Sequence, residues 1–431
     1  MIRYREFSRV VMRQRDIGIV PHMKATGRWL LAVVVMAASV LAVWAAADRG
    51  LAQNSATVKP SLEKVFPSAN KCKRCHERAF EEWETSPLSR SIHSPAFRAS
   101  LDEYLAFSGN KDKALCFRCH APHVNEFVDQ APMFVAQVQS GDPAIDGVGC
   151  AQCHLIKAVD RSIHPPVPKY EPGKTLFGPY KDYVENRAHE SLEVDLFRKS
   201  DLCMNCHFSV PAAATLGKNN DLLGAYESST AFKSGKECQT CHMPEQIGES
   251  ANGENKRKVA NHSFPGRVGK LRQEAAKLEL KTEVKGDQTK VTVTVQSLVP
   301  HNLPTTHPAW ASVVLDLTIK GKNLKTVYRE QRVYGRTYAN AKGQKTVFDF
   351  EATKVLEDTV LKPEETRAEV FTFPTPKDAP SFDVEASLNY APVAGRPAFL
   401  QRIEAESARG AQDPVFQSIP IVKQAANVPL K

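Results

Sequence analysis

Apolar and polar positions alternate along the chain after about residue 276. Between residues 278 and 284, apolar or β-branched side chains alternate with charged ones, and the alternation returns between residues 291 and 295. Gly286 and Asp287 stand between the two runs, and a two-residue period on both sides of such a pair is typical of a β-hairpin. The pattern therefore predicts two antiparallel strands joined by a tight turn.

Three more short runs with this period follow, at residues 313–319, 370–373 and 382–388. Several short strands separated by turn residues favour an antiparallel sandwich, of the immunoglobulin-like type. Residues 276–431 are therefore predicted to form a β-sandwich domain. Its last stretch, from residue 397, has no clear period and is predicted to be an irregular tail.

The stretch before this domain has a different pattern. Residues 71–266 contain many Pro, Ser, Asn and Gly residues and few long periodic runs, which predicts short helices joined by long loops. The predicted fold class is therefore α+β and multidomain. A mainly α and loop domain occupies residues 71–266, linkers occupy residues 48–70 and 267–275, and the β-sandwich follows.

All ten cysteines belong to five C-x-x-C-H units. Such a unit suits covalent haem c, because the two thiols add to the haem vinyl groups and the next histidine is held beneath the iron as its proximal ligand. A redox dithiol or half of a zinc site is the alternative for a single unit, but five units that use every cysteine favour five covalently attached haems. The haem-binding cysteines are Cys72, Cys75, Cys116, Cys119, Cys150, Cys153, Cys203, Cys206, Cys238 and Cys241. The proximal ligands are His76, His120, His154, His207 and His242.

A 19-residue apolar run from Trp29 to Ala47 follows the positive side chains of Lys24 and Arg28. It ends in small residues suited to signal-peptidase cleavage, and so predicts export to the periplasm or the cell surface. The same length also suits an uncleaved anchor in the inner membrane. Residues 1–47 are therefore assigned to an export signal or an anchor.

The formal charge of +9 changes once the first 47 residues are set aside, because the rest of the chain keeps 50 basic and 46 acidic side chains. Haem propionates would offset this small excess. The sequence also has no basic stripe interleaved with aromatic residues. We therefore expect no nucleic-acid partner.

The sixth ligand of each iron decides between an electron carrier and an enzyme. Outside the motifs and the export segment, seven histidines are available for five irons. An iron with two histidine ligands changes charge while leaving no position for a substrate, as in an electron carrier. The predicted distal ligands are His93, His123, His164, His189 and His262. Each also has a structural alternative, as a surface, capping or backbone-bonded histidine. His301 and His307 stay open as ligands, interface residues or internally bonded residues.

Several short segments carry a family resemblance. They are Trp83-x-x-Ser86 before His93, Gly149 before the third motif, Gly178-Pro179 before His189, and Cys241-His242-Met243-Pro244 followed by residues 261–266. Together they resemble the multihaem c-type cytochromes related to the nitrifier tetrahaem cytochrome and to hydroxylamine-oxidoreductase-like proteins, over about residues 66–266. The resemblance implies that His93, His189 and His262 are distal ligands and that the haems lie in near-contact pairs. The segment from His301 to Thr305 also resembles part of a β-domain appended to larger members.

The expected function is electron transport through closely packed bis-histidine haems in a respiratory chain. The expected partners are redox proteins, such as a membrane quinol-oxidising complex, other cytochromes or a terminal reductase. The alternative is a multihaem oxidoreductase that acts on a small nitrogen or sulfur compound at one five-coordinate haem. No motif ends in lysine, which separates the chain from pentahaem nitrite reductases, and no residue is assigned as catalytic. For the β-domain alone, a docking module is a further possibility.

Overall fold

The first 61 residues, which include the predicted export segment, lie outside the part of the chain that the structure describes. This computed structural model describes residues 62–109, 115–163, 166–208, 222–266, 269–305, 311–377, 379–392, 397–408 and 418–430. No helix among these residues is long and apolar enough to cross a membrane. Residues 61–431 cluster as one compact unit, so the domain division near residues 266 and 276 stays a prediction.

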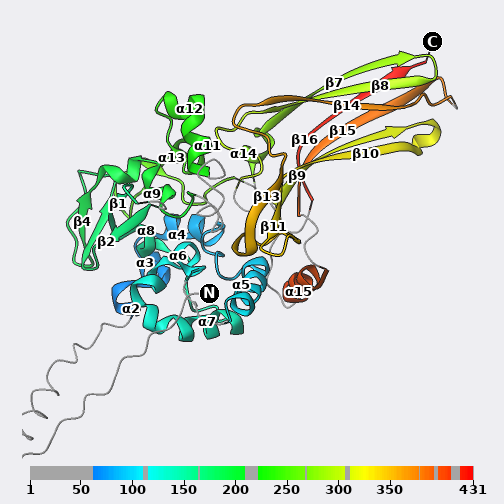
Figure 1. The fold of residues 1–431 in the computed structure, drawn as a ribbon. Coiled ribbons are helices and arrows are strands. Elements are labelled where there is room, and N and C mark those ends of the chain that lie inside the picture. Colours follow the sequence, from blue (N-terminus) through cyan, green and yellow to red (C-terminus); the bar gives the residue numbers. More distant parts are fainter. Residues whose placement is uncertain are drawn as a thin grey trace, which may run out of the picture. The chain divides into compact units, whose positions relative to one another are not determined.

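Short helices joined by longer irregular segments occupy residues 62–266, here called the motif region, as the sequence predicted (Figure 1). The helices are α2 (Leu62–Val65), α3 (Ala69–Lys73), α4 (Glu77–Glu84), α5 (Pro95–Ser108), α6 (Phe117–His120), α7 (Ala131–Ser140), α8 (Cys150–His154), α9 (Asp201–Met204), α11 (Leu222–Ser228), α12 (Thr230–Lys233) and α13 (Cys238–His242). The described residues also include the 3-10 helices η1 (Pro122–Gln130), between α6 and α7, and η2 (Asp195–Arg198), before α9.

Helix α5 illustrates how local sequence sets these elements. The Ser94 hydroxyl accepts a hydrogen bond from the Phe97 amide at 3.4 Å, and Pro95 occupies the first turn, where its missing N–H costs nothing. Gly109 ends the helix with a φ of +61°, which favours glycine. The buried face of α5 packs with α6 and α7 into a core that includes Phe97, Leu101, Leu105, Phe117, Phe134 and Val138.

Among its described residues, the motif region also contains three short strand pairs, two between the third and fourth motifs and one after the fifth, where the sequence predicted only loops. They are β1 (Ile156–Asp160) with β2 (Val167–Tyr170), β3 (Thr175–Gly178) with β4 (Glu190–Glu193), and β5 (Glu245–Gly248) with β6 (Arg257–Ala260). The β3–β4 pair is parallel and the other two are antiparallel. Strands of four or five residues are too short to show a clear period, which explains why the pattern missed them.

The C-terminal region is an antiparallel β-sandwich, as predicted. Its strands are β7 (Ala276–Lys285), β8 (Gln288–Ser297), β9 (Ala311–Lys320), β10 (Thr326–Tyr334), β11 (Arg336–Asn340), β12 (Lys345–Thr346), β13 (Ala352–Asp358), β14 (Thr366–Pro374), β15 (Ser381–Pro392) and β16 (Ile419–Pro429). One sheet has the order β14-β8-β7, a second β10-β9-β15-β16, and a smaller one β12-β11-β13. Helix α14 (Lys270–Gln273) precedes the first strand, in the predicted linker.

The predicted hairpin is β7 and β8. Lys285 pairs with Gln288 across a two-residue turn, and Gly286 has a φ of +59° there. The side chains on one face of each large sheet form a common core, whose members include Val291, Val293, Val295, Leu315, Leu317, Phe371, Phe382 and Leu388. This shared core makes the two sheets the layers of a sandwich.

The prediction of an irregular tail was wrong. Residues 397–408 form helix α15 (Pro397–Ala408), and residues 419–429 form β16, which pairs along β15 at the edge of its sheet. Most of β16 is exposed and only Ile421 is buried. An edge strand that buries so little has no alternation to detect in the sequence.

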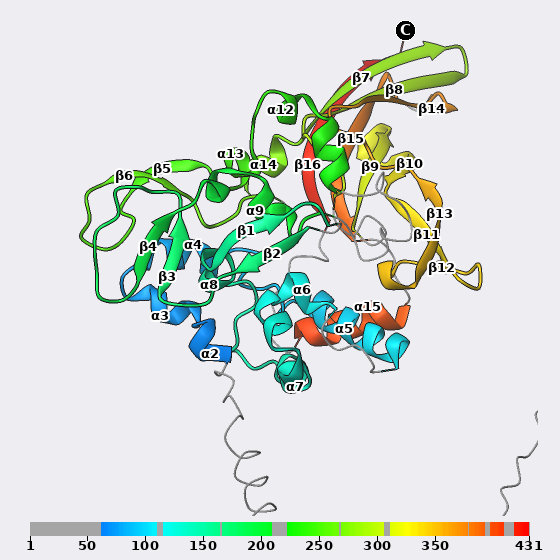
Figure 2. The same ribbon diagram turned by 60° about the vertical axis from the view of Figure 1, so that its left-hand side comes forward.

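The β-domain contacts the motif region through α15 and the segment before β13. Figure 2 shows α15 beside α5, and Phe399 and Ile403 of α15 form a buried cluster with Ala99 of α5 and with Phe348. The Arg402 guanidinium lies 3.8 Å from the Asp102 carboxylate and 3.5 Å from the Glu103 carboxylate. The Tyr104 ring also meets Phe350 edge-on, at 5.3 Å between ring centres.

Candidate haem centres

Each C-x-x-C-H motif forms about one helical turn, at helices α3, α6, α8, α9 and α13. The amide of the histidine donates to the carbonyl of the first cysteine in the motif, at 2.9 Å for His76, 3.2 Å for His120 and 2.9 Å for His207. Residues three and four positions apart lie on one face of such a turn. Two sulfurs and one imidazole therefore gather on one side, as covalent attachment and axial ligation of one haem require.

The ten cysteines all lie in the described residues, and none forms a disulfide. Thiols of different motifs come within hydrogen-bonding reach of each other: Cys72 with Cys150, Cys119 with Cys206, and Cys203 with Cys238. These contacts join the first motif to the third, and the second to the fourth and fifth. Cys153 of the third motif also lies close enough to Cys203 and Cys206 to influence them electrostatically. All five motifs therefore belong to one connected group.

Most of the candidate histidines hydrogen-bond a backbone carbonyl through Nδ1, over 2.6 to 3.1 Å. They are His76, His120, His154, His189, His242, His262 and His301. A proton on Nδ1 leaves the lone pair on Nε2, and this kind of outer hydrogen bond orients a metal-binding imidazole and raises its basicity. The donor set therefore fits haem iron.

His76 and His189 face each other. Their ring centres lie 6.2 Å apart and the ring planes differ by 25°. Two nitrogen–metal bonds of about 2 Å, with about 1 Å from each nitrogen to its ring centre, separate two ring centres by about 6 Å. The spacing thus matches two imidazoles on opposite sides of one metal ion.

His242 and His301 show the same relation, with ring centres 6.3 Å apart and planes that differ by 26°. The sequence left the role of His301 open. The His301-x-x-Pro304 segment resembles part of an appended β-domain, and this resemblance was the one indication in the sequence of a role for His301. It did not indicate which haem motif His301 would approach. His301 follows β8, so the β-domain brings it to a motif at the end of the motif region.

His262 lies close enough to His154 for the two rings to interact electrostatically. Burial lowers the pKa of His262 to about 4, and His154 adds to this effect. The imidazole is therefore neutral at pH 7, which is the form that binds a metal. The Glu82 carboxylate of α4 fixes this segment by accepting a hydrogen bond from the His262 amide at 2.8 Å.

His123 has a different environment from the one that the sequence suggested. It is 3% exposed, between the rings of Phe66 and Phe134. The Gly149 amide donates to the Gln152 carbonyl oxygen at 3.0 Å, so the Gln152 amide nitrogen donates to His123 Nδ1 at 2.8 Å. Burial lowers the pKa of His123 to about 4. The neutral ring then carries its proton on Nε2, and this geometry favours a structural role in place of the predicted ligand role.

His93 differs from these histidines because its hydrogen bond to a backbone carbonyl involves Nε2 and not Nδ1. Its Nε2 lies 2.9 Å from the Ile145 carbonyl. It belongs to the segment that holds the second motif, because the Ser91 carbonyl accepts the hydrogen bond of His120 Nδ1 at 2.9 Å. Its assignment as a distal ligand stays a prediction, with Nδ1 as the nitrogen left for a metal. The remaining candidates His164 and His307 lie outside the described residues.

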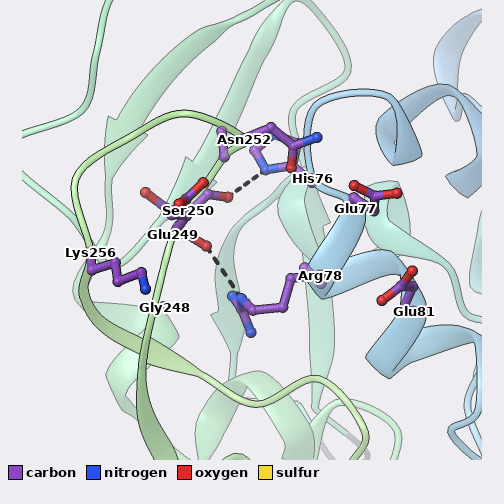
Figure 3. Close-up of a pocket in the computed structure, with 11 residues that line it drawn as sticks. His76, Glu77, Arg78, Glu81, Gly248, Glu249, Ser250, Asn252 and Lys256 are labelled. Atoms are coloured by element: carbon purple, nitrogen blue, oxygen red, sulfur yellow. Dashed lines mark hydrogen bonds between the residues drawn. The ribbon is translucent and has the colours of Figure 1, made fainter.

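A pocket of 420 Å³ lies beside His76, between α4 and the loop from Gly248 to Asn252 (Figure 3). The Ser250 carbonyl in this loop accepts from His76 Nδ1 at 2.7 Å, and the Asn252 amide donates to the Cys75 carbonyl at 2.7 Å. The pocket therefore borders the hydrogen-bonded side of the ring. The loop from Gly248 to Asn252 therefore positions the first motif, although the two segments are more than 170 residues apart in the sequence.

Comparison with known proteins gave a family match and a likeness in fold. Residues 71–155 match the family of cytochrome c554 and c-prime. The matched stretch holds the first three motifs. Comparison with curated proteins gave no match.

Among solved structures, the chain is similar to a penta-heme cytochrome c552 from Thermochromatium tepidum, with a TM-score of 0.61 and 20% sequence identity, over 85% of this chain and 100% of that one. Since this share exceeds the motif region, the likeness in fold extends into the β-domain. The C-terminal domain of wzt has a TM-score of 0.20 and 12% identity, over 36% of this chain and 71% of that one, and carries no argument. The family match and the fold support a multihaem c-type cytochrome that binds haem c.

Proposed function

We propose that the protein carries electrons through five covalently bound haems in a respiratory chain. The observation that carries this proposal is the contact between thiols of different motifs, such as Cys72 with Cys150 and Cys203 with Cys238. Each of these sulfurs is a predicted attachment point of one haem. Haems attached through neighbouring sulfurs lie close together, and a connected series of close haems lets an electron pass without movement of the protein.

The axial ligands support an electron carrier over an enzyme. His76 and His189 have the spacing of two ligands on one metal, and His154 lies close enough to His262 to affect its pKa electrostatically. Haem iron, when bound, supplies one-electron redox chemistry. The chain's own carbonyl groups, at Ser250 and Glu190, hold the two imidazoles of the first pair in one orientation. An iron closed on both sides takes up an electron and leaves no position for a substrate.

We further propose that the protein acts in the periplasm or at the cell surface. The apolar run from Trp29 to Ala47 supports export, and C-x-x-C-H motifs serve covalent attachment of haem. Its partners are then other redox proteins, namely a quinol-oxidising membrane complex on one side and a cytochrome or terminal reductase on the other.

The test is electron paramagnetic resonance of the ferric protein, combined with its mass and with carbon monoxide binding by the reduced form. We expect a mass with five added haems, low-spin signals alone and no bound carbon monoxide. A stoichiometric high-spin haem that binds carbon monoxide would instead favour the oxidoreductase that acts on a small nitrogen or sulfur compound. A mass with fewer haems would contradict the five-haem assignment.

A further inference from the structure

His301 lies in the connection between β8 and β9, outside the motif region. Its ring faces His242 of the fifth motif with the spacing and the small interplanar angle of the His76–His189 pair, 6.3 Å and 26° against 6.2 Å and 25°. The Asn302 carbonyl lies 3.0 Å from His301 Nδ1. His242 Nδ1 likewise lies 2.6 Å from the Pro265 carbonyl. The Nε2 atom of each ring is thus left to bind a metal ion.

We propose that His301 of the β-domain is the sixth ligand of the iron whose proximal ligand is His242. The inference rests on the proposed function in one respect, that the fifth motif carries a haem. It adds a metal ligand that the motif pattern does not contain. It also makes the β-domain part of a haem centre.

The backbone around His301 is held on both sides by one segment of the β-domain. Leu303 and Leu361 exchange two backbone hydrogen bonds, at 2.9 and 3.0 Å, and both side chains are buried. On the other side of His301, the Glu364 amide donates to the Val299 carbonyl at 3.2 Å. A ligand held by backbone hydrogen bonds before and after it keeps a fixed position, as an axial ligand requires.

The same segment also holds the helix that leads into the fifth motif. The Glu364 carboxylate accepts hydrogen bonds from the Thr230 amide, at 3.2 Å, and from the Thr230 hydroxyl. Thr230 begins α12, and Cys238 follows five residues after the end of that helix. A carboxylate at the start of a helix satisfies amides that have no partner within the helix. Residues 361–364 therefore position both sides of the proposed centre, His301 and the approach to His242.

The alternative roles of His301 do not account for this arrangement. A histidine whose role is only to hydrogen-bond its own loop would not have to lie next to the imidazole of His242. A surface histidine for partner docking would be exposed, whereas His301 is half-buried and its ring lies 6.3 Å from that of His242. A pair of half-buried imidazoles, each bonded to a backbone carbonyl through Nδ1, is a donor set that fits a bis-histidine haem.

The test compares the full-length haem-loaded protein with two single variants, His301→Ala and His307→Ala. We expect His301→Ala to gain one high-spin ferric haem and to bind one additional carbon monoxide per chain. Added imidazole should restore the low-spin spectrum. His307→Ala is the matched control from the same connection, and it should leave the spectra unchanged. A His301→Ala protein with unchanged spin state and unchanged reduction potentials would overturn the inference, as would a high-spin haem that arises in His307→Ala alone.

A second variant decides the matter if His301→Ala does not mature. His301→Met keeps a ligand of similar reach, and methionine ligation raises the reduction potential. We expect one potential to rise while all haems stay low-spin, and a full set of unchanged potentials would refute the ligand role. The haem count of the unsubstituted protein separates the two claims. A missing fifth haem contradicts the proposed function, whereas five haems with no response to either His301 variant contradict only this inference.

Discussion

At the scale of single residues, a backbone carbonyl fixes the orientation of most of the candidate imidazoles that the structure describes. The carbonyl that bonds His76 belongs to Ser250, 174 positions away, and the one that bonds His154 belongs to Phe177. Proximal ligands follow from the sequence because the motif brings thiols and imidazole together within one turn. Distal ligands do not, because their pairing depends on contacts that form only in the folded chain.

The histidine facing His76 gives a test of this pairing. We expect His189→Ala to convert one haem to the high-spin state and to add one carbon monoxide site per chain, because the imidazole opposite His76 is removed. Electron paramagnetic resonance and carbon monoxide titration measure both effects. A variant whose haems all stay low-spin would show that His189 is not a ligand.

The buried His123 provides the matched control. We expect His123→Leu to keep every haem low-spin and to lower the free energy of unfolding by about 1–3 kcal/mol, because the buried Gln152 amide loses its acceptor. Chemical unfolding measures the second effect. A new high-spin haem in this variant would restore His123 to the set of ligands.

At the scale of elements, the sequence predicted strands with a clear alternation of apolar side chains and missed others, such as β10 and β16, that are largely exposed. Strands β8 and β15 bury every second side chain in the sandwich core, so their alternation is visible. Strands β10 and β16 lie at opposite edges of one sheet. Much of each faces solvent, and the side chains of β10 include charged residues such as Arg329 and Glu330. These two segments form strands because they hydrogen-bond to β9 and β15, and their own sequence patterns do not indicate it.

The contact between β9 and edge strand β10 predicts a pH effect. Burial alone would raise the pKa of Asp316, but hydrogen bonds from Arg329, at 3.0 and 3.1 Å, and from Gln331, at 2.6 Å, outweigh it and hold this pKa below the usual value. A carboxyl group whose pKa is lower in the folded than in the unfolded state stabilises the fold above its unfolded-state pKa, which is about 4 for aspartate. This contribution is lost as the pH falls through the pKa of the folded state.

We therefore expect Asp316→Asn to lower the free energy of unfolding at pH 7 by about 0.2–1 kcal/mol, since Arg329 is largely exposed. The variant should also lose less stability than the unsubstituted protein between pH 5 and about pH 3. Urea unfolding followed by circular dichroism at each pH gives both values. An equal acid sensitivity of the two proteins would contradict this role of Asp316.

At the scale of the whole molecule, two sets of contacts among the described residues link the β-domain to the motif region, besides the His242–His301 ring pair. One is the cluster of Phe348, Phe399 and Ile403 against α5, and the other is Glu364 at the start of α12. The haem ligand proposed at His301 would add a third link. A domain that touched its neighbour at one small surface would move and unfold independently, so these links favour joint unfolding.

We expect the loss of strand structure and the change of the haem spectrum to occur in one thermal transition. Far-UV circular dichroism reports the β-domain and Soret absorbance reports the haem centres, and coincidence of the two curves is the test of cooperative unfolding. Phe348 is 3% exposed within the α15–α5 cluster, so Phe348→Ala should cost about 3–5 kcal/mol by leaving a cavity. Because the cluster joins both regions, this variant should lower the midpoints of both curves together. Two separated transitions in the unsubstituted protein would mean that the β-domain folds on its own, and that its contacts with α5 and α12 contribute little to the stability of the haem centres.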